Sequence, residues 1–226
     1  MPESPLSPEK AVTETRERLL NAAERLFAQH GIDSVSMRQI NREAGQKNTS
    51  SIHYYFGSRE AIIEAVIERR MSAINTRRMR LIEELEAAGR QGELAELVAA
   101  YVRPLATQPG TGNGSNAYVR FLAQAYASSG IDVLKIARGR WDQSLVDLVR
   151  LISACLPEIP RNVVRERILN FFRIVVYVLA DRERDILTGR TSRNRMPLDA
   201  QVEDLISTQA SALAAPHRMS GRQDRR

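Results

Sequence analysis

Side chains that can donate and accept hydrogen bonds are concentrated between positions 47 and 54 of the chain. They are Lys47, Asn48, Thr49, Ser50, Ser51, His53 and Tyr54. Ile52, Tyr55 and Phe56 have the spacing of one helix face and can pack inward against the rest of the protein. The opposite face of such a helix is small and polar, so its groups can reach the phosphates and base edges of DNA. This division of one short helix predicts a nucleic-acid contact.

Each polar residue of this stretch also has an ordinary structural explanation. Asn48 can serve only as the N-cap of the helix, Ser51 can be buried against its neighbours, and Tyr54 can be a surface aromatic. His53 has no His or Cys nearby in the sequence, so we interpret it as a phosphate donor and not as a metal ligand. For each residue alone, the structural explanation is simpler than a role in DNA binding. Together, however, the structural explanations do not account for the division of the helix into an apolar and a polar face.

A second short helix is expected immediately before this one. The segment from Ser36 to Gln39 has the form of a capping box, and Gly45 ends the helix that the box begins. The next helix follows the cap at Asn48 and runs to about Tyr55. Two short helices joined by a glycine-containing turn predict a helix-turn-helix, in which the second helix can enter a DNA major groove. Ser58 is then expected to cap a long helix.

Positive charge is unevenly distributed along the chain. The full sequence has 33 Lys and Arg against 27 Asp and Glu, a formal net charge of +6. Between positions 36 and 59 only Glu43 opposes the basic residues Arg38, Arg42, Lys47 and Arg59. A further basic cluster consists of Arg69, Arg70, Arg77, Arg78 and Arg80. Excess positive charge on the expected helix-turn-helix favours an anionic partner such as double-stranded DNA.

Gly and Pro residues divide the sequence into segments of helical length, and no alternating run is long enough to predict a strand. We therefore predict an all-α fold of nine helices. Their expected ranges are 13–30, 36–45, 48–55, a long helix from 58, and then 93–107, 115–127, 131–156, 161–188 and 198–214.

Other classes of protein have less support in the sequence. The first residues lack the basic and apolar regions of a secretory signal, and the apolar run from Ile168 to Ala180 is too short to span a bilayer, so we expect a cytoplasmic protein. The lone Cys155 cannot form an intrachain disulfide. An all-α enzyme would have to use His53, His30 or Asp142, but no catalytic or metal-ligand spacing predicts an enzyme, a metal or another cofactor. A sequence-indifferent architectural DNA-binding protein is the other alternative.

Three segments of the chain resemble a known family. They are 22–31 (AAERLFAQHG), 36–45 (SMRQINREAG) and 52–62 (IHYYFGSREAI). Their order and spacing resemble the N-terminal domain of TetR-type transcriptional regulators over about residues 12–66, and the family's nine-helix plan agrees with the count above. The resemblance implies that Ser36 contacts a phosphate, that residues 48–51 read bases, and that Arg59 is the basic group opening the fourth helix. His53 stands where Tyr is common and Asn41 where Ala is common, and the turn is one residue longer.

Dimerisation is expected because a single DNA-reading helix binds weakly. One cation and several hydroxyls on one copy give non-specific dissociation constants of only about 10⁻⁴ to 10⁻⁶ M. Two copies about 34 Å apart would read a palindrome in successive major grooves. The last two helices have apolar faces that a four-helix bundle between subunits would bury, as the resemblance implies, although an intramolecular core would also bury them. The residues assigned to this dimer surface are Ile168, Phe171, Phe172, Val175, Val176, Leu179 and Leu205.

The resemblance also implies that the middle helices hold a small apolar or amphipathic effector. We assign Tyr118, Phe121 and Trp141 to its pocket, although aromatic residues at helical spacing usually belong to a packed core. We expect a ligand-responsive repressor that an inducer releases from a palindromic operator. An activator, or a regulator that senses nothing, fits the residues almost as well. In this mechanism the long fourth helix changes the spacing of the two DNA-reading helices.

These expectations divide the chain into four parts. A mobile N-terminal tail is expected over residues 1–12, and the helix-turn-helix DNA-binding domain over 13–57. The helical domain for ligand binding and dimerisation is expected over 58–214, followed by a mobile basic tail over 215–226.

Overall fold

The computed structural model describes residues 8–46, 51–107, 117–190 and 195–217, and these ranges are all helical apart from their connections, which confirms the predicted fold class. The first four helices are α1 (Pro8–His30), α2 (Met37–Glu43), α3 (Ser51–Phe56) and α4 (Arg59–Ala87). The next four are α5 (Leu94–Ala106), α6 (Ala117–Ala127), α7 (Val133–Ala137) and α8 (Gln143–Ala154). The last two are α9 (Arg161–Leu187) and α10 (Leu198–Ala214).

The described residues form ten helices, not nine, because the segment 131–156 is interrupted. Gly139 adopts a φ of +70°, and its backbone N–H donates to the Asp142 carboxylate at 2.8 Å. A residue in this left-handed conformation cannot continue an α-helix, so the predicted single helix becomes α7 and α8. At the other end of the chain, α1 already begins at Pro8, so the expected tail is wrong for residues 8–12.

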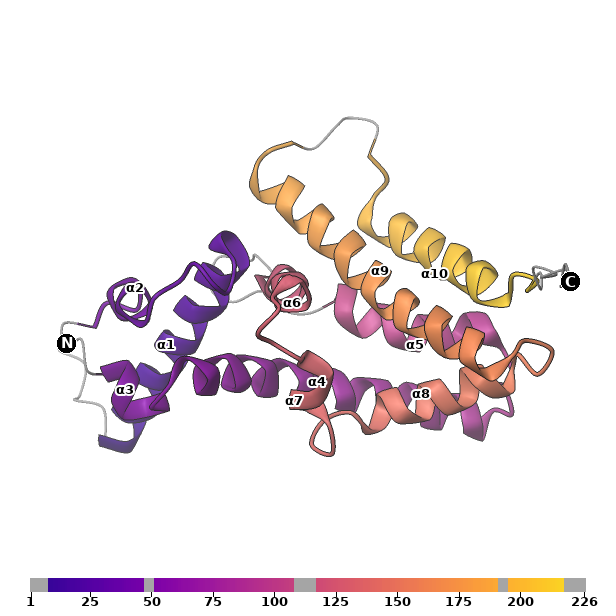
Figure 1. Ribbon diagram of the computed structural model, residues 1–226, viewed down its shortest axis with the longest axis horizontal. Coiled ribbons are helices and arrows are strands. Elements are labelled where there is room, and N and C mark those ends of the chain that lie inside the picture. Colours follow the sequence, from indigo (N-terminus) through magenta and orange to yellow (C-terminus); the bar gives the residue numbers. More distant parts are fainter. Residues whose placement is uncertain (1–7, 47–50, 108–116, 191–194, 218–226) are drawn as a thin grey trace, which may run out of the picture.

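The long helix α4 joins the two halves of the molecule. It starts beside α3 and runs along the length of the protein below α5, as Figure 1 shows, and it packs against both α5 and α8. Helix α6 packs against both α1 and α9, while α10 covers α5 and α9. The small N-terminal unit of α1, α2 and α3 is therefore attached to the rest of the protein mainly where α1 packs on α6 and on α4, and also where α3 contacts α4.

The apolar stripe of α1 is what fastens this unit. Leu19, Leu20, Ala23 and Phe27 are completely buried, and the ring of Phe27 lies 6.1 Å from the ring of Phe121 on α6. Because this face of α1 contributes to the core of both halves, a shift of α6 would displace α1 as well.

The assignment of seven residues to a dimer surface is wrong. All seven are at most 6% exposed within the single chain, where they form part of its own core: Ile168, Phe171, Phe172, Val175, Val176, Leu179 and Leu205. Phe172, for example, stacks on Tyr101 of α5 with ring centroids 4.4 Å apart. The intramolecular partners α5 and α6 already cover this face, so a second copy cannot reach it.

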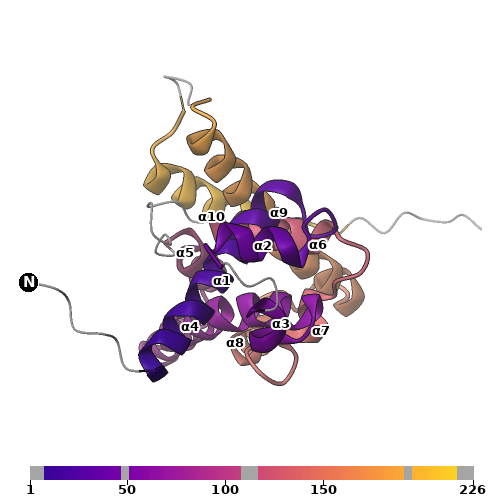
Figure 2. The same cartoon turned by 90° about the vertical axis from the view of Figure 1, so that its left-hand side faces the viewer.

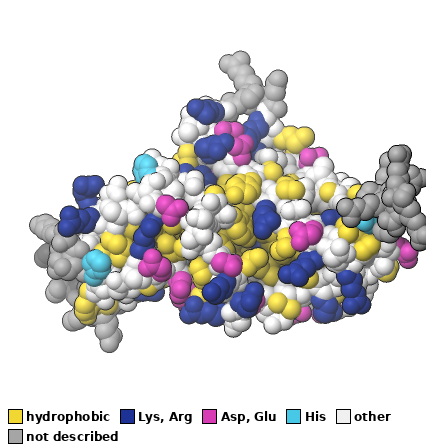
Figure 3. Space-filling view, in the orientation of Figure 1, with side chains coloured by type: hydrophobic (Ala, Val, Ile, Leu, Met, Phe, Trp, Pro, Cys, Tyr) yellow, Lys and Arg dark blue, Asp and Glu magenta, His cyan; other side chains and the backbone are white. Residues whose placement is uncertain are grey.

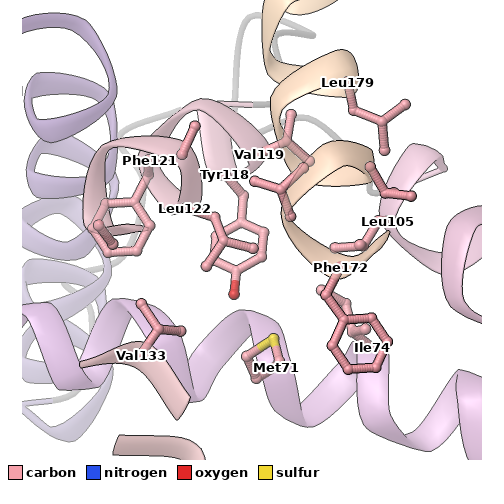
Figure 4. Close-up of a cluster of buried hydrophobic side chains, with 14 of the residues drawn as sticks. Met71, Ile74, Leu105, Tyr118, Val119, Phe121, Leu122, Val133, Phe172 and Leu179 are labelled. Carbon is pink, nitrogen blue, oxygen red and sulfur yellow. The ribbon is translucent and has the colours of Figure 1, made fainter. Parts of the chain in front are cut away.

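The residues assigned to an effector pocket lie in two environments. Tyr118 and Phe121 of α6 are completely buried, and their rings lie 6.0 Å apart in the cluster of apolar side chains drawn in Figure 4. Trp141 is half-buried on the turn before α8, where the guanidinium of Arg140 lies 4.6 Å from its ring. A role in ligand binding stays a prediction for all three.

Candidate nucleic-acid interface

The helix α2 is held by the capping box that the sequence predicts. The Ser36 hydroxyl accepts from the backbone N–H of Gln39 at 3.3 Å, and the Gln39 side-chain oxygen accepts from the backbone N–H of Ser36 at 2.7 Å. The Ser36 hydroxyl also donates to that side-chain oxygen at 2.8 Å. To donate to a DNA phosphate, the Ser36 hydroxyl would therefore have to give up its hydrogen bond to the Gln39 side-chain oxygen.

The helix α3 sorts its side chains as its sequence pattern predicts. Ile52 is completely buried, whereas Tyr55 and Phe56 are half-buried against the same core. His53 is exposed, and Tyr54 is 81% exposed with its ring edge-on to the ring of Tyr55. The apolar residues anchor α3, so two of its polar side chains are held outward on a fixed support.

Four residues assigned to DNA binding, Lys47, Asn48, Thr49 and Ser50, lie outside the described residues. Ser51 begins α3 and is half-buried. The Nδ1 atom of His53 lies 3.1 Å from the carbonyl oxygen of Gly57, so the ring donates there. Its Nε2 atom can then donate to a phosphate only when the ring carries both protons.

Exposed arginines stand beside α3. Arg38 and Arg42 of α2 are both exposed, and the turned view of Figure 2 places α2 and α3 together at the near end of the molecule. Basic side chains are visible over α2 at the left of the surface in Figure 3. This end of the protein thus combines a polar helix face with positive charge, which is the combination that phosphate contact requires.

Arg59 at the start of α4 is only loosely engaged. Its Nη2 atom lies 3.8 Å from the carboxylate of Asp33, and neither its Nη2 nor its Nε has a hydrogen-bond partner among the described residues. Ser58 caps the helix by accepting from the backbone N–H of Ala61 at 3.1 Å. Hydrogen bonds from the backbone N–H of Glu60 and from Ser58 lower the pKa of Glu60, which keeps this helix start ordered around an ionised carboxylate.

A buried ion cluster, which the sequence did not reveal, links this unit to α4. Glu24 of α1 is completely buried and accepts from Arg69 at 2.6 Å and from Arg70 at 2.9 and 2.7 Å. Arg69 also donates to Glu17 at 3.0 Å and to Asn21 at 2.8 Å. Glu24 lies on the same helix face as Leu20 and Phe27, and that position in an apolar stripe is the signal that could have identified it.

A groove of about 1080 Å³ lies between α1, α6 and the C-terminal half of α9. Figure 3 shows hydrophobic side chains gathered in the middle of one face of the molecule. The walls of the groove include Ala28 of α1, Ala123 of α6, and Tyr177 and Leu187 of α9. Tyr118, Phe121 and Trp141 do not line this groove. Among the described residues, no helix combines the length and the apolar character needed to cross a membrane.

Comparison with known proteins identifies both halves of the chain. Residues 19–66 match the family model of bacterial regulatory proteins of the tetR family, and residues 99–212 match that of the tetracyclin repressor-like C-terminal domain. The HTH-type transcriptional repressor NicS of Pseudomonas putida is 34% identical over 85 residues, which span 38% of this chain and 39% of that relative.

Solved structures of low sequence identity have the same fold. NalD of Pseudomonas aeruginosa, the secondary repressor of the MexAB-OprM multidrug efflux pump, has a TM-score of 0.56 at 20% identity, covering 89% of this chain and 97% of its own. FadR of Bacillus subtilis, solved with stearoyl-CoA, has a TM-score of 0.54 at 15% identity, covering 87% and 98%. With the N-terminal domain and the helical C-terminal domain both matched, the chain belongs to the TetR family of bacterial regulatory proteins.

Proposed function

We propose that this protein is a ligand-responsive repressor that acts in the cytoplasm and binds a palindromic operator as a homodimer. The observation that carries the proposal is the geometry of α3, in which Ile52 is completely buried while Tyr54 is 81% exposed. The exposed Arg38 and Arg42 on α2 supply phosphate contacts next to this face. The segment 47–50, which precedes α3, supplies the base-reading groups.

The dimer surface consists of the apolar side chains that α9, α10 and the segment before α10 leave exposed. Ile174, Tyr177, Ile186, Leu187, Met196 and Leu198 are each between 38% and 51% exposed. A second copy packed across these residues would bury apolar surface that water otherwise covers, and it would also cover the groove beside Tyr177 and Leu187. This arrangement keeps the two last helices in the interface, through their outward faces.

The effector acts by favouring one of two spacings of the DNA-reading helices. The rigid connection of α1 to α4 through Glu24, and of α1 to α6 through Phe27, supports this mechanism because a change in the C-terminal domain displaces α1. Two relatives support repression and ligand sensing: NicS is a transcriptional repressor, and FadR was solved with stearoyl-CoA.

The proposal is tested by fluorescence anisotropy with a labelled duplex from the promoter of the protein's own gene and with a scrambled duplex of the same composition. We expect tight binding to the first only, and an affinity that falls steeply between 50 and 200 mM salt. Equal affinity for both duplexes would instead favour a sequence-indifferent architectural protein.

A further inference from the structure

Arg78, in the C-terminal half of α4, is a buried cation with no buried carboxylate bonded to it among the described residues. It is 1% exposed, and its Nη2 atom donates to the carbonyl oxygen of Tyr101 at 3.4 Å. Its guanidinium carbon lies 4.2 Å from the centroid of the Tyr101 ring. Both partners are neutral, and its Nε atom has no hydrogen-bond partner among the described residues.

Among the described residues, no carboxylate compensates the charge of Arg78. The titratable groups that act on it are the hydroxyls of Tyr101, Tyr118 and Tyr126. Burial raises the pKa of all three hydroxyls, so they remain neutral at physiological pH. The internal segments outside the described residues, 47–50, 108–116 and 191–194, contain no Asp or Glu. Burial lowers the pKa of Arg78, yet a guanidinium keeps its proton in proteins.

The same helix shows how this fold treats a buried arginine that has only a structural role. Arg70, two turns before Arg78, donates twice to the completely buried carboxylate of Glu24. Removing a guanidinium from water costs free energy that such a pair recovers in part. At Arg78 only a carbonyl oxygen and an aromatic ring offset this cost, and a buried charge without an opposite charge beside it points to a function.

Apolar and aromatic side chains surround this part of the interior. Met71 and Ile74 lie on the buried face of α4 in the two turns before Arg78. Figure 4 shows these two side chains facing Tyr118 of α6 and Phe172 of α9, with the Tyr118 hydroxyl pointing from α6 toward α4. An occupant of this region would therefore meet one cation within a mostly apolar and aromatic environment.

We propose that the effector of this regulator is an organic monocarboxylic acid, whose carboxylate pairs with Arg78 while its apolar body displaces side chains of α5, α6 and α9. This inference rests on the proposed ligand response. A planar guanidinium forms two parallel hydrogen bonds with a carboxylate. One negative charge balances the single positive charge, whereas a phosphate monoester would leave excess charge buried.

The structure also indicates how such an acid would reach the DNA-binding unit. The Arg70 guanidinium lies 6.0 Å from the ring of Tyr118, and Arg70 donates to Glu24 of α1. An acid that moves Tyr118 would therefore displace Arg70 and, through Glu24, helix α1.

The test is thermal unfolding of the full-length protein with benzoate, phenylacetate or octanoate, each compared with its own uncharged amide. We expect at least one acid to raise the unfolding midpoint while its amide does not. Arg78→Met, which keeps a side chain of similar length without the charge, should lower the affinity for that acid by at least about tenfold. Arg80→Met removes a 77% exposed arginine from the same helix and should leave the affinity unchanged.

If no acid is distinguished from its amide, or if Arg78→Met binds the acid as tightly as the unchanged protein, the proposal is wrong. Should Arg78→Met fail to fold, Arg78→Lys retains a charge without the planar fork, and unchanged acid binding by that variant would also contradict the proposal. DNA binding measured in parallel separates the two claims. If the protein binds its operator specifically but does not distinguish any acid from its amide, the proposed repressor function stands and only the proposal of a carboxylic-acid effector is wrong.

Discussion

Arg59 is the described residue whose surroundings best suit a phosphate contact. It is fixed at the start of α4 next to α3, but its nearest carboxylate, on Asp33, is 3.8 Å away and mostly exposed. An ion pair of this length contributes little, so Asp33 holds the guanidinium only weakly and a DNA phosphate can compete for the exposed part of the Arg59 side chain.

Replacing Arg59 with Ala should weaken binding to operator and scrambled duplex by the same factor, because a phosphate contact carries no sequence information. The slope of log affinity against log salt should become shallower by about 1 per subunit. Asp33→Ala is the matched control: it frees Arg59 and should tighten binding to both duplexes. A loss confined to the operator would show that Arg59 reads bases.

The sequence predicted some side-chain positions in this region, and physical reasons account for both successes and failures. The spacing of Ile52, Tyr55 and Phe56 predicted which face of α3 is buried, because only one face of a six-residue helix can carry all three apolar side chains. Arg78 was grouped only with an arginine-rich stretch, since a basic side chain in a helix is usually solvated. Its place in the stripe with Ile74 and Ile82 was the available signal.

At the scale of elements, the contact between α1 and α4 holds the DNA-binding unit in place. Glu24 is completely buried and is held by two arginines, of which Arg70 is 9% and Arg69 20% exposed in their side chains. Such a cluster allows few alternative geometries, because any rotation of α1 on α4 separates buried opposite charges.

Glu24→Ala should lower the free energy of unfolding by about 3 kcal/mol, because it leaves Arg69 and Arg70 without their buried partner. Glu17→Ala removes a carboxylate that also pairs with Arg69 but is 45% exposed, and it should cost less than about 1 kcal/mol. Urea unfolding followed by circular dichroism measures both variants. Equal losses in the two would mean that the buried cluster has no special role.

Helix lengths and order were predictable from Gly and Pro, but the break between α7 and α8 was not. Gly139 combines a left-handed conformation with a hydrogen bond to Asp142, and the periodicity of apolar residues predicts neither. The sequence likewise did not predict which residues of α9 face outward. That helix is apolar on most sides, so only its packing on α5 and α6 shows that Phe172 faces inward and Ile174 outward.

At the scale of the whole molecule, repression depends on two copies held in a fixed relation. Ile174 and Tyr177 are one turn apart on α9 and are 43% and 45% exposed, so they present a continuous apolar surface to a second copy. Burying charge at such a surface is costly, which makes the dimer sensitive to substitutions that the single chain tolerates.

The double variant Ile174→Asp and Tyr177→Asp should elute as a monomer in size-exclusion chromatography with light scattering, and its operator affinity should fall at least about a hundredfold. Its helical content by circular dichroism should be retained, because neither side chain is buried in the chain. Val146→Asp changes a 54% exposed apolar residue on α8 and should leave the mass unchanged. A double variant that remains a dimer would exclude this face of α9.

The most direct measurement of the paired DNA-reading helices is hydroxyl-radical footprinting of the protein on its own promoter. Two copies of the unit formed by α2 and α3 should protect two symmetric half-sites whose centres are about 10 base pairs, or a multiple of one helical turn, apart. Tyr54→Ala and Arg59→Ala should weaken protection at both half-sites together. A single protected patch without symmetry, or uniform protection along any duplex, would contradict the account.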